Sequence, residues 1–238
     1  MPAVTVVFDL DGTLVDTAPD LVDTLNVVFT QEGLPTVPYD AARNLIGGGA
    51  RRMIERGLQA EGRSCATAEI DRLFAQFIEH YAAHIADRSR PFPGLEWALD
   101  RLAADGARFA VCTNKLEWLA KKLLDALDLS PRFGAVCGQD TFGIQKPNPE
   151  ILRRTVQRAG GTLEHAVMVG DSGSDVVTAR AAGVPIVAVD FGYTEIPVAR
   201  LEPDSLISGF EQLPAAVDDV LGRAVSAADV RIPVSSAR

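Results

Sequence analysis

Cysteine is scarce in this sequence, which argues against a disulfide-bonded scaffold and against a cysteine-based zinc site. The chain has three cysteines, Cys65, Cys112 and Cys137. An odd number at such wide spacing gives neither a disulfide framework nor the paired pattern of a zinc site. Cys112 and Cys137 lie in apolar, strand-like runs. We therefore expect these two to be buried free thiols.

Long hydrophobic runs are also absent. No stretch of about 18 consecutive apolar residues occurs, which is the length that a membrane helix needs. The N-terminus also lacks a basic segment followed by a long apolar stretch, which is the pattern of a secretory signal. We therefore expect a cytoplasmic protein that does not act at a membrane.

Basic residues are outnumbered by acidic ones. The chain has 23 Lys and Arg against 32 Asp and Glu, for a formal net charge of -9. A general nucleic-acid binder would carry a basic face, so we expect no nucleic-acid partner. An anionic substrate would be repelled on average. A local metal ion or basic cluster therefore has to overcome that repulsion.

The rest of the composition is that of an ordinary globular protein. Of its 238 residues, 47% are hydrophobic and 23% are charged. A chain of this length can bury roughly 70–75% of its unfolded surface. One large domain and one domain with an insertion both fit this length.

One stretch near the N-terminus organises the chain. Val4 to Phe8 is a β-branched and apolar run, typical of a strand buried on both faces. Asp9 and Asp11 follow it, and Gly12 then allows a sharp turn. A carboxylate is costly to bury unpaired, so these two require a cation, hydrogen bonds or exposure in a cleft. The alternative interpretation is a plain acidic turn.

The sequence divides into regions of different periodicity. Residues 16–90 show helical patterns and no convincing strand. From Pro91 onward strands and helices alternate, which favours a parallel sheet with helices on both faces. Because the strand Val4–Phe8 needs such neighbours, residues 1–15 and 91–223 are predicted to form one α/β core domain. Residues 16–90 are predicted to be an all-helical insertion, and residues 224–238 a flexible tail after a last helix at Glu211–Leu221.

Polar residues directly follow three of the predicted strands. Asp9 and Asp11 follow the first strand, Thr113 and Asn114 follow residues 107–112, and Asp171 follows residues 166–169. In open parallel sheets ligands bind at the carboxyl ends of the strands. These residues are therefore expected to converge on one crevice, which the acidic-turn interpretation does not explain.

The segment from Gly170 to Asp175 is open to more than one interpretation. Asp171 can join Asp9 as a hard oxygen ligand, which suits Mg²⁺. Asp171 or Ser172 can instead cap a helix. The Gly-Asp-Ser-Gly string also occurs around the serine nucleophile of trypsin-like proteases, but the surrounding α/β pattern argues against that fold.

Two further segments offer positive charge. Lys146 lies in a loop before a helix, and the prolines at 147 and 149 stiffen the backbone of that loop. It can present a charge to phosphate and to a carboxylate, or it can be an ordinary solvated lysine. The glycine loop 47–49 is followed by Arg51 and Arg52. It can be a flexible turn or an anion cradle at a helix N-terminus.

Four motifs in order resemble those of the haloacid dehalogenase-like superfamily, in its phosphatase branch. They are Asp9-Leu10-Asp11-Gly12-Thr13, Thr113-Asn114-Lys115, Lys146-Pro147-Asn148-Pro149 and Gly170-Asp171-Ser172-Gly173-Ser174-Asp175. Dehalogenases of the family lack the second aspartate of the first motif, which this chain has. The resemblance covers about Val4 to Leu221, and it is to the phosphoglycolate phosphatase-like group.

This resemblance implies a fold and a reaction. The fold would be a Rossmann-like parallel-sheet core with a helical C1 cap at residues 16–90. The reaction would be a Mg²⁺-dependent hydrolysis of a phosphomonoester through an aspartyl-phosphate. Asp9 would be the nucleophile. Asp11 would protonate the leaving alkoxide and then take a proton from water.

The resemblance also implies a role for each remaining motif residue. Asp9, the backbone carbonyl of Asp11, and Asp171 would bind Mg²⁺, and Asp175 would orient Lys146 or a metal-bound water. Phosphoryl oxygens would be held by Thr113, Asn114 and the catalytic Lys146. The cap loop would read the rest of the substrate through Gly48 and either Arg51 or Arg52.

The substrate expected from the resemblance is 2-phosphoglycolate, which would give glycolate and phosphate. A sugar-phosphate phosphatase or a phosphomutase of the same superfamily is the alternative within this class. A phospho-acceptor signalling module is the alternative from another class, although such modules are about half this length and have no cap. We expect a small phosphorylated metabolite as partner, and a monomer or homodimer.

Overall fold

A parallel sheet of six strands forms the centre of the molecule, in the order β5-β4-β1-β6-β7-β8. The computed structural model describes residues 3–43, 45–63, 66–194 and 196–229. The strands are β1 (Thr5–Phe8), β4 (Arg108–Cys112), β5 (Ala135–Cys137), β6 (Ala166–Gly170), β7 (Ile186–Val189) and β8 (Ser205–Ile207). The chain therefore leaves β1, adds β4 and β5 on one side, and then crosses to β6 on the other.

Strand β1 is buried on both faces, as its apolar run predicts. It pairs with β4 and β6, and Phe8 lies opposite Val111 and Val169. Val6 and Phe8 pack into one hydrophobic cluster and Val7 into the other. Because successive strand residues point to opposite faces, the two clusters are the two sides of the sheet.

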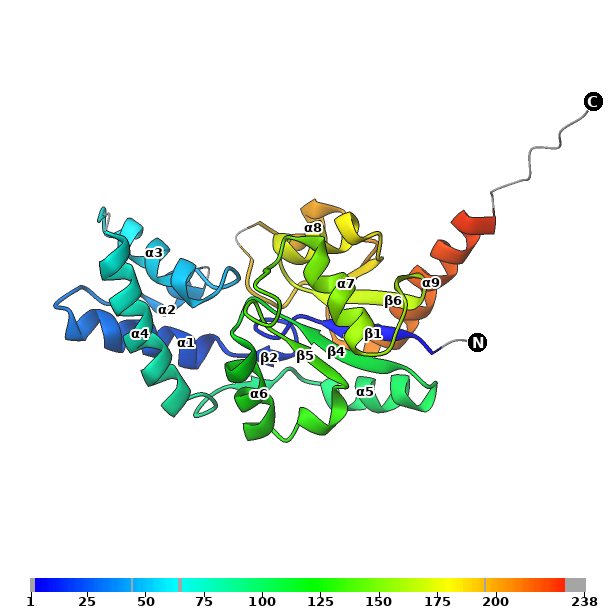
Figure 1. The fold of residues 1–238 in the computed structure, drawn as a ribbon, viewed down its shortest axis with the longest axis horizontal. Coiled ribbons are helices and arrows are strands. Elements are labelled where there is room, and N and C mark those ends of the chain that lie inside the picture. Colours follow the sequence, from blue (N-terminus) through cyan, green and yellow to red (C-terminus); the bar gives the residue numbers. More distant parts are fainter. Residues whose placement is uncertain (1–2, 44, 64–65, 195, 230–238) are drawn as a thin grey trace, which may run out of the picture.

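Helices cover both faces of the sheet (Figure 1). One cluster joins the sheet to α5 (Leu95–Ala104), α6 (Glu117–Ala126) and α9 (Leu213–Asp229). The other joins it to α7 (Pro149–Arg158) and α8 (Gly173–Ala182). Short 3-10 turns occur at Ser130–Arg132, Leu163–His165, Val198–Leu201 and Phe210–Gln212. The predicted α/β class is confirmed.

Four helices form a separate block beyond the carboxyl ends of the strands (Figure 1). They are α1 (Ala18–Gln31), α2 (Tyr39–Arg43), α3 (Ala50–Ala60) and α4 (Thr67–Ala83). Two short strands, β2 (Val15–Asp16) and β3 (Arg90–Pro91), pair antiparallel where the chain enters and leaves the block. This pairing holds the two crossing segments together, so the block faces the end of the sheet where β1 stops.

The structure corrects some boundaries. β2 and β3 were not predicted, since two-residue strands are too short to show alternation. The last helix continues to Asp229, so residues 224–229 are helical and not part of a tail. An alanine-rich stretch there favours helix. Residues 230–238, which complete the predicted tail, lie outside the described residues.

Cys112 and Cys137 are buried free thiols, as predicted, and Cys65 lies outside the described residues. Within the described ranges, none of the helices has the length and apolarity required to cross a membrane.

Candidate active site

The loop after β1 carries the first two carboxylates. The Asp9 backbone N–H still bonds to the Val169 carbonyl of β6 at 2.9 Å, so Asp9 sits at the end of the sheet ladder. Its side chain is only 10% exposed. Gly12 has a φ of 82°, and a Cβ at this position would lie 2.4 Å from Asp171 Oδ2. A glycine is therefore required for the loop to pass so close to Asp171.

Lys146 is buried among carboxylates. Its Nζ lies 2.9 Å from Asp9 Oδ1 and 2.6 Å from Asp175 Oδ1. Asn114 fixes the lysine's backbone, because its Oδ1 accepts from the Lys146 N–H at 2.8 Å and its Nδ2 donates to the Lys146 carbonyl at 3.2 Å. The end of β4 therefore holds the Lys146 loop in place.

Asp171 and Asp175 lie at the end of β6 and the start of α8. Asp171 accepts from the Thr13 hydroxyl at 3.0 Å and from the Tyr193 N–H at 2.6 Å. Asp175 accepts from the Ser172 N–H at 3.0 Å and the Ser172 hydroxyl at 2.6 Å, in a capping box at the N-terminus of α8. The helix-cap interpretation thus applies to Ser172, together with Asp175.

Burial of these carboxylates perturbs their charge states. It raises the pKa of Asp9 to about 6, with Asp175 and Asp11 adding to the shift and Lys146 opposing it. Burial and the charges of Asp175 and Asp9 also raise the pKa of Asp171 well above its usual value. For Lys146, burial acts to lower the pKa, but the attraction of Asp175 and Asp9 outweighs it and the pKa is raised. One lysine does not neutralise three buried carboxylates.

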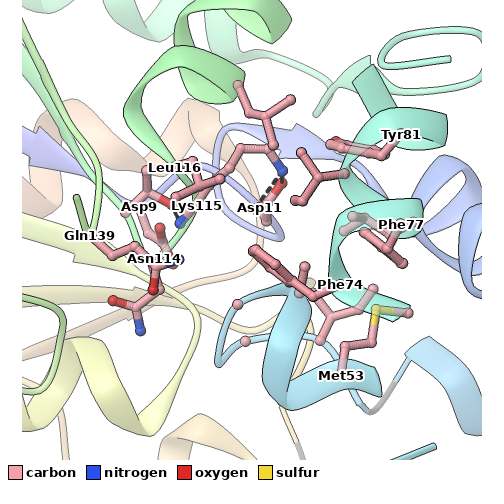
Figure 2. Close-up of a pocket in the computed structure, with 18 residues that line it drawn as sticks. Asp9, Asp11, Met53, Phe74, Phe77, Tyr81, Asn114, Lys115, Leu116 and Gln139 are labelled. Atoms are coloured by element: carbon pink, nitrogen blue, oxygen red, sulfur yellow. Dashed lines mark hydrogen bonds and ion pairs between the residues drawn. The ribbon is translucent and has the colours of Figure 1, made fainter. Parts of the chain in front are cut away.

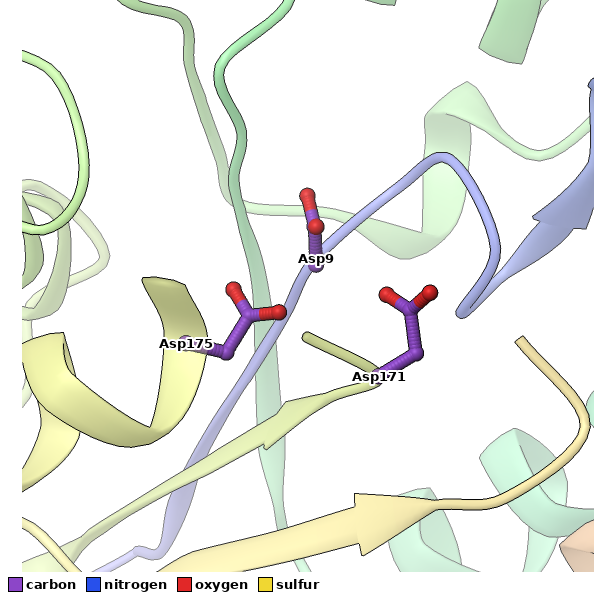
Figure 3. A group of neighbouring side chains, drawn as sticks. All are labelled: Asp9, Asp171 and Asp175. Carbon is purple, nitrogen blue, oxygen red and sulfur yellow. The ribbon is translucent and has the colours of Figure 1, made fainter. Parts of the chain in front are cut away.

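The carboxylates form a group suited to a divalent cation. Oxygens of Asp9, Asp171 and Asp175 lie within 4.8 Å of one another; Asp9 directly follows β1, Asp171 directly follows β6, and Asp175 is in α8 (Figure 3). Hard oxygen donors with excess negative charge are what Mg²⁺ requires. Asp175 already accepts from Lys146 and Ser172. The residues present therefore fit a metal ion, with Asp9 and Asp171 the better placed pair.

Asp11 is held by a residue to which the sequence analysis assigned no role. Lys115 Nζ donates to both Asp11 carboxylate oxygens, at 2.8 and 2.9 Å. The same ammonium lies 4.6 Å from the centroid of the Tyr81 ring, which comes from α4 of the helical block (Figure 2). For Lys115, burial acts to lower the pKa, but Asp11 outweighs it and the pKa is raised.

A pocket lies between the strand ends and the helical block, and we call it the interface pocket (Figure 2). The sheet side contributes polar residues that include Asp9, Asp11, Thr113, Asn114 and Lys115. The helical block contributes mostly apolar residues, among them Met53, Phe74, Phe77 and Tyr81. The first and second predicted motifs therefore converge on one pocket, and apolar side chains of the helical block lie opposite them.

Gly48 and Arg51 lie beside this pocket. Both line a neighbouring hollow that reaches Lys146 and Asn114. The Arg51 guanidinium pairs with Asp71 and lies over the Phe74 ring, and its side chain is 43% exposed. Gly49, not Gly48, makes the close approach to the core, since its Cβ would lie 3.1 Å from the Asn114 carbonyl. That Gly48 and Arg51 bind the substrate stays a prediction.

Sequence reasoning missed Tyr81 and the role of Lys115. The signal for Lys115 was present, because it directly follows two predicted site residues at the end of a strand. The sequence around Tyr81 did not indicate a role in the site, since an aromatic residue at helical spacing is usually a residue of the hydrophobic core. Its contact with Lys115 depends on how the block docks onto the sheet.

Comparison with known proteins identifies the family. The haloacid dehalogenase-like hydrolase family profile matches residues 6–189. The chain is 47% identical over 219 residues to a phosphoglycolate phosphatase of Mesorhizobium japonicum, covering 92% of this chain and 96% of that one. It is 49% identical over 212 residues to a phosphoglycolate phosphatase of Caulobacter vibrioides, covering 89% and 90% respectively.

A solved structure agrees with these relatives. A crystal structure from Haemophilus somnus, described as a predicted phosphoglycolate phosphatase, superimposes with a TM-score of 0.83 at 27% identity, covering 90% of this chain and 98% of that one. The expectation of a phosphatase with this fold is thereby confirmed. The chain belongs to the haloacid dehalogenase-like hydrolase family.

Proposed function

We propose that this phosphatase hydrolyses 2-phosphoglycolate to glycolate and phosphate, with Mg²⁺ bound and through an aspartyl-phosphate on Asp9. One observation carries the mechanism: two carboxylates of the same loop form ion pairs with two different lysines, Asp9 with Lys146 and Asp11 with Lys115. The substrate is supported by the relatives named phosphoglycolate phosphatase. A screen of phosphorylated metabolites with Mg²⁺ tests both, and 2-phosphoglycolate is expected to give the highest kcat/KM.

Asp9 is the proposed nucleophile. Its Oδ1 accepts from the Leu10 N–H at 2.7 Å and pairs with Lys146, whereas no described residue donates to its Oδ2. Oδ2 is therefore the oxygen available to attack phosphorus, with the carboxylate orientation fixed through the other oxygen. Attack forms an Asp9–phosphorus bond and breaks the bond to the ester oxygen.

Asp11 is the proposed acid and base. It lies in the same loop, two residues further on, and lines the interface pocket together with Asp9. In the first step Asp11 gives a proton to the departing alkoxide. In the second step it takes a proton from the water that hydrolyses the aspartyl-phosphate, which restores Asp9.

Lys146, Thr113 and Asn114 are proposed to hold the phosphoryl group. Lys146 supplies a fixed positive charge next to Asp9, oriented by Asp175. Thr113 lines the interface pocket and offers a hydroxyl. Asn114 also positions Lys146, since both ends of its amide bond to the Lys146 backbone.

Mg²⁺ is proposed to bind through Asp9, Asp171 and the backbone carbonyl of Asp11. When bound, it would neutralise charge on the phosphoryl oxygens. Asp171 is held for this by the Thr13 hydroxyl and the Tyr193 N–H. Asp175 keeps its contacts with Lys146 and Ser172 and orients the surroundings of the metal.

The helical block, residues 16–90, is proposed to be a cap domain on a core formed by residues 1–15 and 91–223. It closes the interface pocket with apolar side chains from α3 and α4. Such a wall excludes water while the phosphoryl group is transferred. A small phosphorylated metabolite as substrate, a cytoplasmic location, and a monomeric or homodimeric state remain predictions.

Metal dependence is the first test. Activity is expected to vanish in excess chelator, to return with Mg²⁺, and to be inhibited by Ca²⁺, because Ca²⁺ takes more ligands at about 2.3–2.6 Å against about 2.0–2.1 Å for Mg²⁺. Mg²⁺ should also raise the melting temperature by mass action, and Asp171→Asn should weaken that rise. Full activity in chelator, or equal support by Ca²⁺, would contradict the metal assignment.

Asp11→Asn should affect substrates according to their leaving group. A poor alkoxide leaving group needs protonation, whereas an aryl oxide needs it far less. The variant is expected to lose about 10²–10⁴-fold in kcat/KM on 2-phosphoglycolate and much less on 4-nitrophenyl phosphate. Steady-state kinetics on both substrates checks this. Equal losses on the two would argue against the acid role.

A further inference from the structure

Lys115 is a buried cation between the core and the helical block. Its side chain is 5% exposed, and its Nζ bonds to both oxygens of Asp11 while lying over the ring of Tyr81. In the proposed phosphate chemistry Lys115 has no role beyond its pairing with Asp11. A buried ammonium requires a negative partner, and Asp11 is that partner in the structure, so any anionic group that enters the pocket beside Asp11 meets the same charge.

The interface pocket contains little positive charge. Of the described residues that line it, Lys115 is the one with a cationic side chain. The other cations near the site do not line this pocket: Lys146 pairs with Asp9 and Asp175, and Arg51 and Arg52 line the neighbouring hollow, where Arg51 pairs with Asp71. An anionic group on the leaving-group side of a substrate would therefore meet Lys115.

Tyr81 gives a second observation, from the helical block. Its side chain is buried against Lys115, and within the described part of the chain its hydroxyl has no hydrogen-bond partner. Buried hydroxyls are usually hydrogen-bonded, and an orphan donor at the wall of a pocket indicates a missing acceptor. In Figure 2, Tyr81 lies beside the contact between Lys115 and Asp11.

We propose that Lys115 is the specificity-determining residue of the active site, and that its ammonium, with the Tyr81 hydroxyl, binds a carboxylate one carbon away from the ester oxygen of the substrate. This rests on the proposed function. Asp11 must contact the ester oxygen to protonate it, and Lys115 contacts Asp11. In 2-phosphoglycolate a single methylene separates the ester oxygen from the carboxylate, so the carboxylate falls within reach of Lys115.

The binding is an exchange of partners. Without substrate, Lys115 pairs with Asp11; a bound carboxylate takes one or more of its N–H donors and the free Tyr81 hydroxyl. Apolar neighbours such as Phe74 and Phe77 strengthen this contact, because charges attract more strongly where water is excluded. A neutral substrate offers no such exchange. Since Lys115 belongs to the core and Tyr81 to α4, the carboxylate also links the two parts.

The test compares two substrates that share an alkoxide leaving group. They are 2-phosphoglycolate and 2-hydroxyethyl phosphate, in which a hydroxymethyl group replaces the carboxylate. The wild-type protein is expected to prefer 2-phosphoglycolate. In Lys115→Met, the ratio of the two kcat/KM values should fall about 100-fold or more, the size of effect seen when one partner of a buried charge pair is removed.

Three further variants sharpen the test. Tyr81→Phe removes one oxygen and should lower the same ratio by about tenfold. Lys115→Arg keeps the charge and should retain much of the preference; it also serves if Lys115→Met does not fold. Arg51→Ala tests the competing cation, and under this proposal it should change the ratio far less than Lys115→Met.

The outcomes separate the two proposals. A wild-type protein that hydrolyses neither substrate would overturn the proposed function. If the wild-type protein hydrolyses both equally well, the phosphatase stands and the Lys115 assignment fails. Equal losses on both substrates in Lys115→Met also overturn it, and would leave Lys115 as a residue that only positions Asp11. A ratio that falls with Arg51→Ala instead would assign the carboxylate to Arg51.

Discussion

Asp9→Asn is expected to lose roughly 10⁴-fold or more in kcat on 2-phosphoglycolate while the protein remains folded. The amide has the shape of the carboxylate but is a poor nucleophile, and it removes a negative charge from the proposed metal site. Steady-state kinetics with Mg²⁺ measures the loss. Acid quenching of the wild-type reaction should in addition trap phosphate on the protein, and the variant should trap none.

Stability distinguishes a lost nucleophile from a lost fold. Burial, chiefly, raises the pKa of Asp9 from 3.8 to about 6. A carboxyl whose pKa is raised on folding lowers the stability of the protein once the carboxyl is ionised. For Asp9 this loss of stability is absent below a pH of 3.8, grows as the pH rises to about 6, and is complete above that pH. In chelator at pH 7, Asp9→Asn should therefore melt at or above the wild-type temperature, with no such gain near pH 3.

Near-normal turnover by a folded Asp9→Asn protein would remove the covalent mechanism. A variant that melts well below the wild-type protein in chelator would instead contradict the expected effect of Asp9 on stability. Circular dichroism on the same samples decides between loss of fold and loss of chemistry.

The sequence was sufficient to predict the parts of the site that follow strands. Asp9, Thr113 and Asp171 each come after an apolar run, and parallel strands bring their carboxyl ends to one edge. The structure places these residues together, as expected from that rule. The α/β class followed from the same alternation of strands and helices.

Contacts between distant side chains could not be predicted in this way. Lys115 and Asp11 are separated by 104 positions, and their pairing depends on the register of β1 with β4 and on the loops beyond them. Tyr81 reaches Lys115 only because α4 docks against the strand ends. The resemblance assigned Asn114 to the phosphoryl group, and it gave no sign that both ends of its amide bond to the Lys146 backbone. Periodicity places residues on elements but does not dock one element on another.

Lys146→Met is expected to weaken both the fold and the reaction. The Lys146 side chain is 1% exposed, and its Nζ lies 2.9 Å from Asp9 and 2.6 Å from Asp175, whose side chain is fully buried. Methionine keeps much of the stem but leaves two carboxylates without their cation. Removing one partner of a buried ion pair costs about 3–5 kcal/mol in the free energy of unfolding. Denaturant unfolding in chelator measures this cost.

A double variant separates the structural role of Lys146 from its chemical role. In Lys146→Met/Asp175→Asn the second change removes the unpaired charge, and the Asn carbonyl can still accept from Ser172 at the start of α8. The double variant should therefore recover much of the unfolding free energy, a coupling that two independent changes would not show. It should recover none of the activity, because the proposed phosphoryl group still lacks its lysine. Recovered activity in the double variant, or a Lys146→Met protein as stable as the wild type, would contradict this account of Lys146.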